Sequence, residues 1–141
     1  MQKYIGTKII EAEPCKAWKD TKLHKAGEDG YKVRYPDGYE SWSPKGVFEE
    51  AYRPTGCMSF GLAIEAMKKG KKVARRGWNG KNQHIELATR ISYMTAEGVF
   101  MNVEHEAIGN KAIAFCGTSG VQMGWLASQA DMLADDWEVV E

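Results

Sequence analysis

The sequence predicts an α+β protein: a small antiparallel sheet packed with one main helix, preceded by a small module of a β-hairpin and a helix. Short segments that alternate apolar and polar residues around turn sequences are typical of antiparallel strands. One apolar stripe with helical spacing begins after Ser59. The segment Arg53-Pro54-Thr55-Gly56 contains two residue types that break regular structure. We therefore expect two modules, residues 1–53 and residues 58–141.

The first module is predicted to begin with strands. Thr7–Ala12 has the pattern of a short strand, and the polar segment 16–30 is expected to be a loop or a weak helix. Tyr31–Tyr35 and Tyr39–Ser43 alternate on either side of Pro36-Asp37-Gly38. Proline presets the first turn angle and glycine accepts a positive φ, so these two segments form a hairpin.

A helix is predicted to close the first module, over residues 45–52. Ser43 is expected to cap it and Pro44 to be its first residue. The aromatic residues of this module form either its core or a binding surface: Tyr31, Tyr35, Tyr39 and Trp42.

The second module is predicted to begin with the main helix, capped by Ser59. Gly70 is expected to end it, since glycine accepts the left-handed conformation found just after a helix. The buried stripe of this helix consists of Phe60, Ala63, Ile64 and Met67.

The remainder of the second module is predicted to form the sheet. Ser128 is expected to cap a short helix or turn that runs through Leu133, and the long segment 91–109 stays ambiguous. The predicted strands are 72–76, 84–88, 112–115, 121–125 and 137–140.

Charge is balanced over the chain but segregated locally. The sequence holds 19 Lys and Arg and 19 Asp and Glu, whereas a protein that coats DNA or RNA would be strongly basic. Seven Lys or Arg and no acid occupy residues 68–81, and five acids and no base occupy residues 131–141. This segregation suits binding of a small anion, packing between subunits, or two ordinary solvated faces.

The cysteine and histidine pattern predicts neither a metal site nor a cofactor. The three cysteines are widely spaced, and the three histidines are scattered, so no zinc-ligand spacing is present. Such cysteine usage fits a reduced, cytosolic compartment. The sequence shows no signal peptide and no apolar run near the roughly 20 residues of a membrane span.

The sequence gives little support for catalysis. It lacks the nucleophile elbow, the P-loop and the dinucleotide-binding glycine pattern. Asp135 and Asp136 either hold a metal or, as adjacent acids, are surface charges. Glu104-His105-Glu106 places acids beside a histidine, but in a predicted loop without a nearby nucleophile.

Residues 72–81 carry the strongest binding signal. Trp78 lies between two glycines, so it either stacks on a ligand base or folds back into the core. Stacking on a base would contribute roughly 1–3 kcal/mol. Arg75 and Arg76 would point to opposite faces of a strand, so only one of them would reach a ligand.

Polar residues in two places could read a nucleotide. Asn79 and Gln129 each offer a donor and an acceptor to a purine edge. Asp131 either accepts from a ribose hydroxyl or an exocyclic amine, or caps a helix and pairs with a cation.

Residues 58–140 resemble the type 2 Thoeris anti-defence proteins of phages. The resemblance rests on three blocks in the same order: Met58-Ser59-Phe60-Gly61-Leu62-Ala63, then GKKVARRGWNGK from Gly70 to Lys81, then WLASQADMLADDW from Trp125 to Trp137. It implies a sponge that acts in the host cell cytoplasm and is not an enzyme. Such proteins sequester glycocyclic ADP-ribose, the signal made by bacterial TIR-domain proteins, and some also bind cyclic dinucleotides such as cyclic GMP–AMP, which drive CBASS-type systems.

The same resemblance implies a homotetramer with ligand pockets between subunits. By similarity, Trp78 would stack on a base, Arg75 or Arg76 would face phosphate, and Phe60 would lie near the pocket wall. The remaining polar contacts would come from Asn79, Ser128, Gln129 and Asp131. Trp125 and Trp137 are expected in the core.

Two departures from short family members leave ligand preference and assembly open. One is the N-terminal module, which looks like a short domain found in other phage proteins, and the other is the segment 91–109. Three alternatives stand beside the sponge: a nucleic-acid-binding phage accessory protein, a cyclic nucleotide hydrolase and a structural phage protein.

Overall fold

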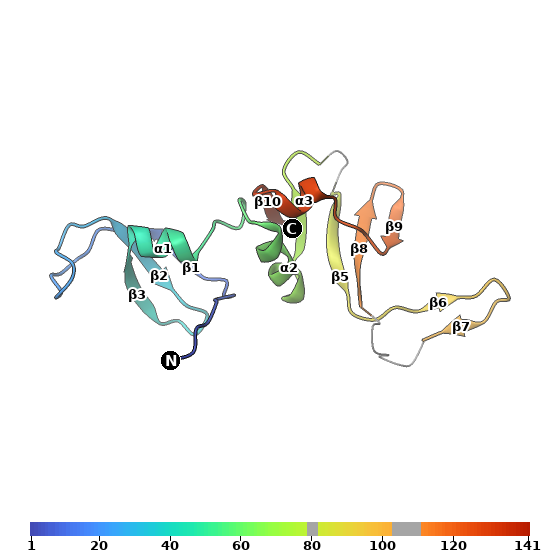
Figure 1. The fold of residues 1–141 in the computed structure, drawn as a ribbon, viewed down its shortest axis with the longest axis horizontal. Coiled ribbons are helices and arrows are strands. Elements are labelled where there is room, and N and C mark those ends of the chain that lie inside the picture. The colour runs from blue at the N-terminus through green and yellow to red at the C-terminus, as the bar shows by residue number, and fades with distance from the viewer. Residues whose placement is uncertain (79–81, 103–110) are drawn as a thin grey trace. The chain divides into compact units, whose positions relative to one another are not determined.

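The computed structural model describes residues 1–78, 82–102 and 111–141. The chain divides into two compact units, Met1–Arg53 and Pro54–Glu141. Each unit combines helix with antiparallel strands, so the predicted α+β class is confirmed (Figure 1). Within the described ranges, no helix has both the length and the apolar composition needed to cross a membrane.

The first unit is a three-stranded antiparallel sheet with one helix. It comprises β1 (Glu11–Pro14), β2 (Gly30–Arg34), β3 (Glu40–Pro44) and α1 (Lys45–Ala51), with α1 packed on β2 and β3. Val33 is almost fully buried, the Tyr31 ring stacks on Phe48 at 4.1 Å, and the Trp42 indole N–H donates to the carbonyl of Cys15 at 2.8 Å. Tyr31 and Trp42 therefore pack inside this unit, whereas Tyr39 is exposed.

Two predicted features of the first unit were wrong in detail. The first strand starts at Glu11 and not at Thr7, because its bounds follow those of β2: Glu11 pairs with Arg34 and Pro14 with Tyr31. Ser43 does not cap the helix, because it lies within β3, and the N-cap is Pro44, which makes no side-chain hydrogen bond.

The second unit contains a five-stranded antiparallel sheet in the order β10-β4-β5-β8-β9. Its strands are β4 (Lys72–Arg75), β5 (His84–Ala88), β8 (Ala112–Gly117), β9 (Gly120–Met123) and β10 (Trp137–Val140). The last strand has its predicted bounds, whereas β9 ends two residues early because Gly124 turns the chain with a φ of 86°. In the segment 91–109, the described residues include a hairpin of β6 (Tyr93–Met94) and β7 (Phe100–Met101).

The main helix α2 (Phe60–Lys68) has the predicted signals at both ends. The Ser59 hydroxyl accepts from the N–H of Leu62 at 3.3 Å. Gly70 has a φ of 85°, and the N–H groups of Gly70 and Lys71 donate to the carbonyls of Met67 and Ala66. These two bonds form a Schellman motif, which closes the helix.

The helix α2 packs on β10, β4 and β5 and encloses the core of the unit. Trp137, Val73 and Ile85 are fully buried within it. Because side chains alternate along a strand, their neighbours project from the other face of the sheet. That second face carries Lys72, Ala74, His84 and Glu138, and it positions the candidate site.

Candidate functional site

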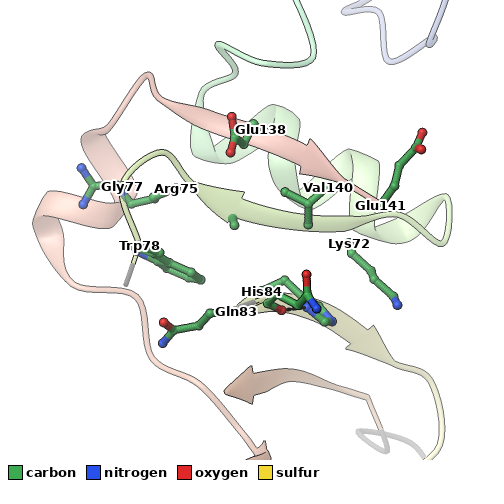
Figure 2. A pocket seen from close by; sticks show the side chains of 11 residues that line it. Lys72, Arg75, Gly77, Trp78, Gln83, His84, Glu138, Val140 and Glu141 are labelled. Carbon is green, nitrogen blue, oxygen red and sulfur yellow. Dashed lines mark hydrogen bonds between the residues drawn. The ribbon is translucent and has the colours of Figure 1, made fainter. Parts of the chain in front are cut away.

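A pocket of about 400 Å³ lies along β4, the start of β5 and the end of β10 (Figure 2). This volume falls in the range of roughly 300–1,000 Å³ typical of small-molecule sites. Its described lining combines an aromatic ring, two cations, two acids and two amides. The residues that matter most for its chemistry are Lys72, Arg75, Trp78, Gln83, His84 and Glu138.

Trp78 lines the pocket and is held there by a tight turn. Gly77 adopts a φ of 84°, which lets the chain leave β4 sharply, and the backbone N–H of Trp78 donates to the carbonyl of Arg75 at 3.2 Å. The side chain is half-buried. The ring therefore packs on the core on one side and borders the pocket on the other.

Three other aromatic rings pack against Trp78. Its ring centroid lies 5.4 Å from Trp137, 5.7 Å from Phe115 and 5.9 Å from Trp125, with the planes tilted by 55° to 74°. Tilted and edge-on contacts of this kind favour a defined ring orientation. Phe60 belongs to the same cluster through Trp125 and Trp137, but it does not line the pocket.

The two arginines have different environments. Arg75 lines the pocket, and its guanidinium donates to Asp136 (Nε to Oδ1, 3.0 Å) and to Asp131 (Nη1 to Oδ1, 3.1 Å). Arg76 instead donates to the carbonyl of Gly56 at 2.7 Å and to the Cys57 thiol at 3.1 Å. Arg76 thus ties the start of the second unit to the end of β4, and Asp136 acts as an ion-pair acid.

Asp131 anchors α3 (Gln129–Leu133) to β4. One carboxylate oxygen accepts from the Ser128 N–H at 3.0 Å and from its hydroxyl at 2.8 Å, which completes a capping box with Ser128 as the N-cap. The other oxygen accepts from Arg75. Burial alone would raise the pKa of Asp131, but these hydrogen bonds and the Arg75 charge outweigh it and lower the pKa.

The predicted site residues therefore do not all meet in one place. Trp78 and Arg75 line the pocket, and Asn79 lies outside the described residues. Gln129 is exposed at the first residue of α3. Five other predicted residues do not line the pocket: Phe60, Arg76, Ser128, Gln129 and Asp131.

Sequence reasoning did not single out several lining residues. Lys72 and Glu138 both line the pocket because β4 and β10 are neighbours, with Ala74 opposite Glu138 and Val140 opposite Lys72. Strand alternation places Lys72 and Ala74 on one face of β4. This alternation was the sequence signal that could have identified Lys72 as a lining residue. Gln83 and His84 enter from the start of β5.

A group of three metal-ligating side chains lies at one end of the β5–β8 pair. The ligand atoms of His84, Glu86 and Cys116 all lie within 4.8 Å of one another. Burial raises the pKa of the Cys116 thiol, and its hydrogen bond to Glu86 adds to that effect. The spacing predicted no metal site because Cys116 is far from His84 in sequence and comes opposite it only through the strand register.

Comparison with known proteins identifies the second unit. The model of the Tad2-like family, described as a Thoeris anti-defense 2-like domain, matches residues 58–140. The chain belongs to this family. A relative named Thoeris anti-defense 2, from Bacillus phage SP01, is 37% identical over 86 residues, which are 59% of this chain and 94% of that protein.

Membership in the Thoeris anti-defense 2-like family gives the chain an anti-defence role. It also confirms the resemblance inferred from the three sequence blocks. The matched range starts at Met58, so the first unit lies outside it. It includes the aromatic cluster, Arg75 with its two acids, and all the pocket residues named above.

Proposed function

We propose that the chain is a sponge that binds a cyclic nucleotide immune signal and sequesters it without degrading it. The proposed ligands are glycocyclic ADP-ribose and cyclic dinucleotides such as cyclic GMP–AMP. Sequestration in the host cell cytoplasm would block Thoeris-type defence and also CBASS-type defence. The observation that carries the proposal is the pocket in which the Trp78 ring lies with the cations Lys72 and Arg75.

The two cations suit the phosphates of such a ligand. A guanidinium has five N–H donors, and the carboxylates of Asp131 and Asp136 engage three of those of Arg75. Two donors remain for a phosphate oxygen. Asp136 and Asp131 also raise the pKa of Arg75, so its charge is fixed. Lys72 is exposed and adds a second positive charge to the pocket lining.

The other lining groups suit the base and the sugar. The exposed part of the Trp78 ring offers a stacking surface, and Gln83 offers both a donor and an acceptor to a base edge. Glu138 can accept from a ribose hydroxyl or an exocyclic amine, and it would repel phosphate toward Lys72 and Arg75. Asn79, next to Trp78, and the exposed Gln129 are proposed as further amide contacts.

Supporting positions are assigned to the remaining predicted residues. Ser128 and Asp131 hold α3 and orient Arg75 through one hydrogen-bonded chain. Phe60 packs in the aromatic cluster that contacts Trp78. Arg76 holds the start of the second unit through its hydrogen bond to the carbonyl of Gly56. These residues would influence binding through the pocket wall.

A sponge needs affinity and no turnover. Keeping a signal below the threshold of its receptor calls for a nanomolar Kd, or about −12 kcal/mol. One stacked base supplies roughly 1–3 kcal/mol, so several contacts must converge. Pockets between subunits would enclose more of the ligand, and we propose a homotetramer. Exposed apolar side chains of the second unit support association, among them Val121, Met123, Leu126, Met132 and Leu133.

Calorimetric titration of the full chain with glycocyclic ADP-ribose and with 3′,3′-cyclic GMP–AMP tests this function. We expect tight binding that Trp78→Ala abolishes, because the stacking surface is lost. Trp18→Ala is the matched control, since Trp18 is an exposed tryptophan of the first unit and should leave the Kd unchanged. Ligand released by heating should have its original mass.

A second pair of variants separates binding from folding. Trp78 packs on the core, so Trp78→Ala changes the packing of the fold as well as the pocket. Lys72→Gln removes only an exposed charge, and Lys71→Gln is its matched control, a neighbouring lysine outside the pocket lining. Losing a charge-assisted hydrogen bond should weaken binding about tenfold or more for Lys72→Gln alone. No binding of either nucleotide, or a cleaved product, would refute the sponge. A steep fall of affinity with salt, measured on single-stranded DNA, would favour a nucleic-acid-binding protein.

A further inference from the structure

We propose that His84, Glu86 and Cys116 form a binding site for a divalent transition-metal ion of the zinc type, on the face of the sheet opposite α2. The three side chains offer an imidazole nitrogen, a carboxylate oxygen and a thiol sulfur. This mixed set is typical of zinc and of its cobalt substitute, and it does not suit Mg²⁺ or Ca²⁺, which take oxygen ligands.

The strand register places the three ligands on one face. His84 lies directly opposite Cys116 in the antiparallel β5–β8 pair. Glu86 lies two residues further along β5, so its side chain projects from the same face as that of His84. Regular strand geometry therefore builds the site on a rigid part of the sheet.

The ligand atoms lie within 4.8 Å of one another, somewhat further apart than around a bound tetrahedral ion. Zinc bonds of roughly 2.0–2.3 Å place neighbouring ligand atoms about 3.3–3.6 Å apart. Here the Cys116 sulfur lies 3.4 Å from a Glu86 oxygen, and the His84 Nε2 lies 4.0 Å from the other Glu86 oxygen. Small rotations of the side chains would complete the geometry.

The orientation of His84 is that of a metal ligand. Its Nδ1 lies 2.5 Å from the backbone carbonyl of Asn82, and a carbonyl can only accept, so Nδ1 carries the proton. In the neutral ring, Nε2 then presents a lone pair. That atom is buried and has no hydrogen-bond partner among the described residues. Metal-bound histidines characteristically donate their second nitrogen to such a carbonyl.

Charge and access also fit a divalent ion. A carboxylate and a thiolate together balance two positive charges, although Lys72 is close enough to act on the Cys116 thiol and opposes the ion in part. The Glu86 side chain is 40% exposed, which leaves a route for the ion and room for a water as fourth ligand. A bound ion would link β5 to β8.

Titration of the reduced, chelator-treated full chain with Co²⁺ tests the site. We expect one equivalent to bind and to produce a near-ultraviolet sulfur-to-cobalt charge-transfer band, which Zn²⁺ then removes by displacing Co²⁺. Cys116→Ser should abolish the band, and His84→Gln should weaken Zn²⁺ binding about 100-fold. The exposed Cys57 supplies the matched control, since Cys57→Ser should leave the band and the affinity unchanged.

The wild-type spectrum decides the question without depending on any variant. A cobalt spectrum that lacks the sulfur band would overturn the proposal. So would a band that persists in Cys116→Ser or disappears in Cys57→Ser. Because the titration contains no nucleotide, its result is independent of the sponge function.

Discussion

Asp131 connects three parts of the second unit. Its carboxylate holds Ser128 at the start of α3 and Arg75 on β4, and its backbone carbonyl accepts from the indole N–H of Trp137 at 2.9 Å. The side chain is only 16% exposed. The sequence offered Asp131 as a ligand contact. In the structure, both of its carboxylate oxygens instead accept hydrogen bonds from the protein itself.

We expect Asp131→Asn to lower the free energy of unfolding by about 1–2 kcal/mol near neutral pH, because the cap and the ion pair lose their charge. The folded pKa of Asp131 is below its ordinary value of 3.8. Its contribution is therefore complete above that value and is lost as the pH falls through the lower folded pKa. The difference between wild type and variant should shrink in that acidic window, as measured by urea unfolding.

Asp135→Asn is the matched control for this prediction, since Asp135 is an exposed acid of the same segment. It should change stability by less than about 0.5 kcal/mol at every pH. If the Asp131→Asn variant is as stable as wild type at neutral pH but does not bind nucleotide, the result would indicate that Asp131 contacts the ligand directly.

At the scale of the element, α2 shows how a helix end depends on one residue. Gly70 carries the positive φ that closes the Schellman motif, whereas Gly61 lies within the helix. A Cβ at Gly70 would meet nothing within 4 Å, and one at Gly61 would lie 3.9 Å from the Ser59 hydroxyl. Neither substitution is limited by space, so backbone conformation alone decides the outcome.

Gly70→Ala should therefore destabilise the second unit by roughly 1–2 kcal/mol, the cost of a left-handed residue with a Cβ. Gly61→Ala should instead stabilise it by up to about 1 kcal/mol, because alanine favours the helix. Urea unfolding followed by near-ultraviolet circular dichroism measures both. Equal signs for the two variants would contradict the assignment of Gly70 as the residue after the helix.

Local signals predicted some elements well and others poorly. The end signals of α2, the Ser128 cap and the strand Trp137–Val140 were readable because each depends on neighbouring residues. The first strand was misplaced because β2 determines its bounds, and Ser43 was assigned to a cap because its pairing with Tyr31 is not visible locally. Strand ends thus depend on partners that sequence patterns do not reveal.

At the scale of the whole molecule, contacts between distant residues build the site. The family could be inferred from sequence, as could the strand next to Trp78. The pairing of Arg75 with Asp131 spans 56 residues, and His84 meets Cys116 through the β5–β8 register. Such pairs need the sheet order, which local periodicity does not specify.

The two edges of the five-stranded sheet differ, and this difference predicts how copies associate. At the β10 edge, Met58 exchanges backbone hydrogen bonds with Trp137, and the N–H of Val139 donates to Thr55. Among the described residues, β9 pairs with β8 alone, and all four residues of β9 are exposed. Val121 and Met123 lie on the same face of β9. An exposed edge with apolar side chains is a natural place for a second copy to pair.

For the proposed homotetramer, sedimentation velocity should give four times the chain mass of 15.8 kDa. Met123→Lys should reduce the assembled mass, because a lysine on an edge strand opposes pairing. Val47→Lys is the matched control: Val47 is 61% exposed in α1 of the first unit, and the change should leave the mass unaltered. A wild-type chain that sediments as a monomer would refute the tetramer. A tetramer that survives Met123→Lys would keep the assembly but exclude β9 as its interface, since a buried charge at that edge would be too costly to tolerate.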